Sequence, residues 1–162
     1  MTLLNAPAYN ERKERLIKTI LIGSASTIAL LVVLTLAGFM MGHGWLFLNL
    51  PAEHRVGTFF QALQDKDYNK AFAIYNNDAD WKQHLDKYKD YPEERFQDDW
   101  TTQEPIKGPL LSYHVDISRT DGSKQDGGTI VAVRVNGNKK VFMYVIRKTG
   151  VMVWPAFHEL QY

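Results

Sequence analysis

Residues 111–118 read Leu-Ser-Tyr-His-Val-Asp-Ile-Ser, a stretch in which apolar and polar side chains alternate. A period of two is typical of a β-strand with one face buried and the other in water. Three more strands with two turns are expected downstream, in the order 129–135, Asn136-Gly137, 139–148, Thr149-Gly150 and 151–157. Because Asn-Gly between apolar runs is a strong hairpin signal, this part of the chain predicts an antiparallel meander.

Upstream of this meander the apolar period lengthens to that of a helix. One helical face is formed by Val56, Phe59, Phe60 and Leu63. Asp67 can cap a second short helix that ends at residues 76–78, with its inward side chains at Ala71, Ile74 and Tyr75. A third helix is expected from about Pro92 to Trp100. Helices followed by a meander predict an α+β fold, with the helices on one face of a curved antiparallel sheet.

The helical region also resembles a known family. The run is Val56-x-x-Phe59-Phe60-x-Ala62-Leu63-x-x-x-Asp67-Tyr68-x-x-Ala71-Phe72, and it is similar to the opening helices of the nuclear transport factor 2-like, or cystatin-like, cone fold. The resemblance covers about residues 53–160 and implies a cone-like domain with a strongly bent antiparallel sheet. Since this fold hosts enzymes, ligand binders and interaction domains, the resemblance does not select a function.

A long uncharged segment precedes the domain, from Thr19 to Gly42. A helix of this length spans roughly 36 Å, which exceeds the hydrocarbon core of about 30 Å. We expect an uncleaved transmembrane helix, the alternative being a cleaved signal peptide, whose apolar region is usually about 7–15 residues. The predicted organisation is a cytoplasmic segment 1–18, a transmembrane helix 19–42, an interfacial linker 43–52 and an extracytoplasmic α+β domain 53–162.

Positive charge lies on one side of the apolar run only. Four basic residues precede it, whereas none follows until Arg55; the four are Arg12, Lys13, Arg15 and Lys18. Cytoplasmic flanks collect positive charge, so the amino terminus is expected inside and the domain outside an inner or plasma membrane, in the periplasm of a Gram-negative cell. Trp45 and Phe47 fit an aromatic belt at the outer interface. This layout resembles the single-pass cytochrome c oxidase assembly factors.

Composition narrows the classes of function. The 162 residues include 19 Lys and Arg against 18 Asp and Glu, a net charge of +1, and no cysteine. Near neutrality disfavours a nucleic-acid binder, and the absence of cysteine excludes disulfides, thiolate metal sites and cysteine nucleophiles. No metal site or cofactor is expected, because no metal-ligand spacing, phosphate-binding glycine loop or serine elbow occurs; the histidines are His43, His54, His84, His114 and His158.

The irregular segment 80–92 mixes aromatic and charged residues, as binding hot spots do. It supplies the candidate partner-binding residues Trp81, His84, Tyr88 and Tyr91. The alternative is that these rings pack beneath the segment and close the mouth of the cone. Within the apolar run, Gly38-x-x-x-Gly42 and Gly23 predict a small-residue face on which a second helix could pack, or else a coincidence in a lipid-facing helix.

His114 and Asp116 are the candidates for catalysis, since they share one face of the first predicted strand. The resemblance to the cone fold implies such a role, because a carboxylate or His lines the pocket of cone-fold isomerases for proton transfer at a carbonyl. If the pair is buried, desolvation would shift both pKa values toward a range useful for this chemistry. The alternative is an ordinary polar strand face in water.

The sequence supports two functional hypotheses. The leading one is a non-enzymatic, membrane-anchored binding module, an accessory or assembly subunit of a larger membrane complex, with a respiratory complex as the partner that the second resemblance implies. The expected partners are the lipid bilayer and this complex. The alternative is a small-molecule binder or isomerase-like enzyme that uses the cone pocket. No nucleic-acid partner is expected.

Overall fold

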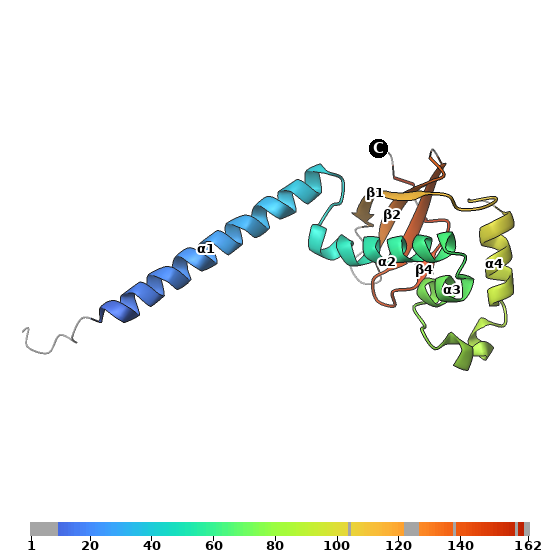
Figure 1. The fold of residues 1–162 in the computed structure, drawn as a ribbon, viewed down its shortest axis with the longest axis horizontal. Helices are drawn as coiled ribbons and strands as arrows, with labels where there is room; N and C mark the ends of the chain where they lie inside the picture. The colour runs from blue at the N-terminus through green and yellow to red at the C-terminus, as the bar shows by residue number, and fades with distance from the viewer. Residues whose placement is uncertain (1–9, 104, 122–126, 138, 158, 161–162) are drawn as a thin grey trace, which may run out of the picture. The chain divides into compact units, whose positions relative to one another are not determined.

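The computed structural model describes residues 10–103, 105–121, 127–137, 139–157 and 159–160. These residues form α-helices, two short 3-10 helices and one antiparallel sheet, so the predicted α+β class is confirmed (Figure 1). The chain divides into two compact units, Met1–Ala37 and Gly38–Tyr162. Residues 1–9 of the predicted cytoplasmic segment, and His158, lie outside the described residues.

The first unit consists of most of helix α1, Glu11–Met40, which is long and apolar enough to cross a membrane. Its large apolar side chains are exposed; Ile22 is 68% exposed and Val33 61%. Four hydroxyl groups of this helix donate hydrogen bonds to its own carbonyls, for example Thr27 to Gly23 at 2.9 Å and Thr35 to Leu31 at 2.8 Å. These hydroxyls therefore need no water, which suits a helix in lipid.

The second unit begins with a turn and the long helix α2, Leu46–Gln64. The prediction of a linker at residues 43–52 is wrong from residue 46 onward, because α2 already starts there and contains Pro51. Tertiary packing accounts for the difference: Asn49 and Ala52 are buried, so these early turns are fixed against the domain. Four large apolar side chains near the start of α2 are about half exposed, and we call Trp45, Phe47, Leu48 and Leu50 the apolar collar.

The other helices follow the predicted pattern. They are α3, Tyr68–Asn76, and α4, Glu93–Thr102, separated by the 3-10 helices η2, Trp81–Gln83, and η3, Leu85–Tyr88. The side chain of Asp67 accepts a hydrogen bond from the Lys70 amide at 3.0 Å, and this confirms the predicted cap of α3. Asn77 ends α3 in the left-handed region at φ 51°, and Pro92 immediately precedes α4.

The sheet is a meander in the order β1-β2-β3-β4. Its strands are β1, Tyr113–Thr120, β2, Gly128–Val135, β3, Lys139–Ile146, and β4, Met152–Val153. The predicted hairpin at Asn136-Gly137 is confirmed, with positive φ at both residues and Val135 paired to Lys139. The fourth strand is far shorter than the predicted 151–157; Pro155, which has no amide hydrogen to donate to a ladder, follows two residues after its end.

A β-bulge at Asp116 breaks the predicted alternation in β1. Before the bulge, Val115 pairs with Val133; after it, Ser118 pairs with Val131, and both of these partners belong to the core. Residues directly opposite each other on paired strands share a face of the sheet. Val115 before the bulge and Ser118 after it therefore both lie on the core face, whereas Ile117 lies on the other face. Leu111, predicted to be buried, is 72% exposed and precedes the strand.

The core lies between α2 and the sheet, and Figure 1 shows α2 running across the strands. The predicted apolar face of α2 is confirmed, because Val56, Phe59 and Phe60 are 0% exposed. Facing it are alternate residues of β2 and β3, namely Val131, Val133, Val135, Val141, Met143 and Val145.

Candidate functional site

The segment between α1 and α2 lies along the free edge of β1. The Ser118 amide donates to the Gly42 carbonyl at 3.1 Å, and the Asn49 side-chain amide donates to the carbonyls of His43 at 3.1 Å and Ser118 at 3.4 Å. Asn49 is 0% exposed. These bonds cover an edge that would otherwise be open to pairing with another chain.

Glu53 completes this polar group, which we call the junction cluster: His43, Asn49, Glu53 and Ser118. Glu53 Oε1 lies 2.9 Å from His43 Nδ1 and 2.5 Å from Ser118 Oγ. The serine hydroxyl therefore contacts the carboxylate and not a ring nitrogen, and Ser118 is 0% exposed. Since a serine nucleophile needs a base and access to substrate, the cluster fixes the junction and has no geometry for acyl transfer. Asn49, a polar residue within an apolar run, was the only sequence signal for it.

The structure does not bring His114 and Asp116 into a cavity. The His114 side chain is 78% exposed, whereas the Asp116 side chain is 5% exposed at the bulge. Arg134 holds the Asp116 carboxylate in a two-pronged contact, from Nε at 3.1 Å and Nη2 at 2.9 Å. His114 Nε2 is 3.9 Å from the same carboxylate. Asp116 thus forms a structural ion pair with Arg134. The geometry of His114 and Asp116 does not support proton transfer by these two residues.

Two of the four predicted partner-binding residues belong to the core. Trp81 is 8% and Tyr88 7% exposed, and their ring centroids lie 4.8 and 5.2 Å from that of Phe72. Tyr91 is half-buried and contacts Phe96. Of the four, His84 is the exposed one, together with neighbours such as Leu85. The prediction of a docking surface made by Trp81 and Tyr88 is therefore wrong, because their rings anchor the segment on α3.

Asp78 organises this segment. Its Oδ2 accepts a hydrogen bond from the Tyr88 hydroxyl at 2.7 Å and lies 2.9 Å from His84 Nδ1 and 3.6 Å from Lys87 Nζ. The hydrogen bond from Tyr88, with further help from His84 and Lys87, holds the pKa of Asp78 below its ordinary value.

The small-residue face predicted for the apolar run is only partly present in α1. Gly23 lies within α1, and its surroundings leave open space for a side chain. Gly38 is in the last turn, where its carbonyl accepts from the His43 amide at 2.9 Å. Gly42 lies beyond the end of α1 at φ 88° against Ile117, so Gly38 and Gly42 do not share a helix face.

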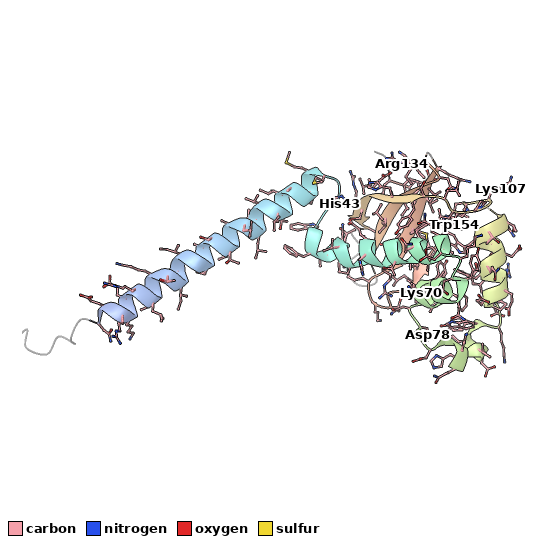
Figure 2. The ribbon with its side chains drawn as sticks, in the orientation of Figure 1. His43, Lys70, Asp78, Lys107, Arg134 and Trp154 are labelled. Carbon is pink, nitrogen blue, oxygen red and sulfur yellow. The ribbon has the colours of Figure 1, made fainter. Side chains whose placement is uncertain are left out.

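A large open groove lies between α2 and α3, with a volume of about 780 Å³. We call it the α2–α3 groove; its floor and rim include His54, Arg55, Lys70, Ala73, Ile74 and Asp78. Arg55 is fixed, because Nη1 donates to Asn77 Oδ1 and to the Gly150 carbonyl, whereas His54 and Lys70 are exposed. Figure 2 labels Lys70 on α3 and Asp78 just after it. Basic groups above an apolar floor suit an acidic partner with apolar side chains. Sequence reasoning missed this groove because its residues come from separate elements.

No protein-family model, curated protein or solved structure matches this chain. The resemblances to the cone fold and to the oxidase assembly factors therefore stay predictions.

Proposed function

We propose that this chain is a single-pass membrane protein whose α+β domain lies outside the cytoplasm and binds another protein of the same membrane. The observation that carries the proposal is α1, whose exposed apolar side chains water would disfavour and lipid would accept. The chain then continues into the apolar collar, which suits the interface between lipid and water.

The four basic residues before the apolar run support an amino terminus in the cytoplasm. The orientation can be tested directly because the chain has no cysteine. We expect Gln83→Cys, on the exposed segment of the domain, to react with a membrane-impermeant maleimide on intact spheroplasts. Lys13→Cys should react only after lysis, and the reverse pattern would contradict the proposed topology.

The role that fits this arrangement is an accessory or assembly subunit, for which the resemblance to oxidase assembly factors suggests a respiratory complex. The surface that we propose for docking is the α2–α3 groove, whose exposed His54 and Lys70 would meet acidic groups of the partner. Tyr88 and Trp81 contribute indirectly, because they hold the neighbouring segment in place.

Gentle extraction of the full-length protein from its native membrane, followed by sizing and mass spectrometry, tests the proposal. We expect a stoichiometric membrane protein to co-migrate, and the double variant His54→Glu with Lys70→Glu to reduce its recovery about tenfold through charge repulsion. Lys107→Glu, an exposed site outside the groove, is the matched control. A lone monomer would argue against the subunit role, and unchanged recovery with the double variant would exclude the groove.

A further inference from the structure

A second, smaller hollow lies between α3, α4 and the chain that follows β4. Its volume is about 200 Å³, and it is more enclosed than the α2–α3 groove. We call it the aromatic pocket; its lining residues are Tyr75, Tyr91, Asp99, Trp100 and Trp154. None of these residues lines the proposed docking groove, so a ligand of the aromatic pocket would bind independently of the proposed function.

The rings of the pocket are held by contacts with one another and with the core. The ring centroid of Trp100 lies 5.7 Å from that of Trp154 and 6.2 Å from that of Tyr75. The Tyr91 ring packs against Phe96 of α4, and the two ring centroids are 6.4 Å apart. The Trp154 amide donates to the Tyr75 hydroxyl oxygen at 3.3 Å. The aromatic walls are therefore fixed before any ligand binds.

Among the described residues that line the pocket, Asp99 is the only acidic one. Its Oδ2 accepts a hydrogen bond from the Tyr91 hydroxyl at 3.0 Å, which orients the carboxylate. In the described part of the chain, no Lys, Arg or His nitrogen lies within the 4.0 Å of an ion pair with it. Arg95 lies instead over the Tyr91 ring, 5.7 Å from its centroid. Burial raises the pKa of both Tyr75 and Tyr91, so these phenols stay neutral at physiological pH.

We propose that the aromatic pocket binds a small methylated ammonium cation of the choline type. The faces of aromatic rings attract cations, most strongly where water is excluded, and a carboxylate balances the ligand's charge. An ammonium group with several N–H bonds would need several hydrogen-bond acceptors, which ring faces do not supply. The methyl groups of a methylated ammonium need no acceptors and pack against the ring faces. The volume of about 200 Å³ admits only a small solute or a single headgroup. Free choline and a phosphatidylcholine headgroup share this chemistry.

The test uses the full-length protein in a maltoside detergent, titrated calorimetrically with choline and with its neutral isostere 3,3-dimethylbutan-1-ol. We expect choline to bind at least about tenfold more tightly than the isostere. Asp99→Asn keeps the acceptor for Tyr91 but removes the charge, and it should weaken choline binding about tenfold or more. Asp98→Asn, an exposed neighbour on α4, is the matched control and should bind choline as the wild type does.

Trp154→Leu is a second, independent variant for the case that Asp99→Asn does not fold. We expect it to weaken choline binding by a similar factor. Nanodiscs containing phosphatidylcholine separate the two sources. If the lipid competes with choline for the pocket, the ligand is the headgroup; if it does not compete, the ligand is a soluble ammonium compound. Both results fit the proposal. Equal binding of the neutral isostere, unchanged affinity in folded Asp99→Asn, or no binding up to about 10 mM choline would overturn it.

Discussion

Asp78 illustrates how a single carboxylate organises a segment without regular structure. It lies just after α3, yet it contacts Tyr88 and Lys87 of η3 and also His84, the residue between η2 and η3. Each contact favours the ionised carboxylate. The segment 80–92 is therefore ordered by buried rings on one side and by this hydrogen-bonded carboxylate on the other.

The contribution of Asp78 to stability should depend on pH. Its folded-state pKa lies below the ordinary value of 3.8, so the ionised group stabilises the fold above that pH, and this contribution is lost as the pH falls through the folded-state pKa. We expect Asp78→Asn to lower the melting temperature at pH 7 and to have a shrinking effect below pH 3.8. Thermal unfolding in a pH series checks this, with Asp80→Asn as the exposed control. A deficit that stays constant down to about pH 2.5 would contradict it.

At the scale of elements, the turn after α1 covers the edge of the sheet that β1 forms. Gly42 carries the positive φ that lets its carbonyl reach the Ser118 amide, and a β-carbon there would lie 2.6 Å from Cγ2 of Ile117. The bulge at Asp116 is what turns Ile117 toward this glycine. The turn and the bulge thus depend on each other.

Two glycine substitutions should have opposite effects. Gly42→Ala should lower the free energy of unfolding by about 1–3 kcal/mol, through backbone strain and the clash with Ile117. Gly57→Ala, within α2 where nothing lies within 4 Å of the added carbon, should raise it by about 0.5–1 kcal/mol. Chemical denaturation of both variants provides the measurement. If Gly42→Ala is neutral, the proposed close packing of the turn on β1 is wrong.

At the scale of the whole molecule, the two compact units divide at Ala37 and Gly38. The core cluster belongs entirely to the second unit, as does the junction cluster. We therefore expect residues 38–162 to fold without the first unit, which contributes a helix long and apolar enough to cross a membrane.

A fragment of residues 38–162 should melt within about 4 °C of the full-length protein, a difference that corresponds to about 1 kcal/mol for a domain of this size. It should still bind lipid vesicles through the apolar collar, whose four side chains are about half exposed. Replacing Trp45, Phe47 and Leu48 with serine should reduce vesicle flotation about tenfold while leaving the melting temperature unchanged. An unfolded fragment, or flotation that survives the serine variant, would contradict these expectations.

The sequence by itself determined the class of fold and most of its elements. Local signals suffice there: an uninterrupted apolar run for α1, a face of Val56, Phe59 and Phe60 for α2, the Asp67 cap, and Asn136-Gly137 for the hairpin. Each depends on residues close in the chain, where periodicity and turn chemistry act directly.

Only the tertiary structure decided which polar and aromatic side chains are free to act. Arg134 of the neighbouring strand holds the predicted catalytic carboxylate of Asp116, and packing on Phe72 buries the predicted docking rings Trp81 and Tyr88. The aromatic pocket likewise joins α3, α4 and the chain after β4. Contacts between residues so distant in the chain leave no periodic signal in the sequence, because they arise from the way the elements pack together.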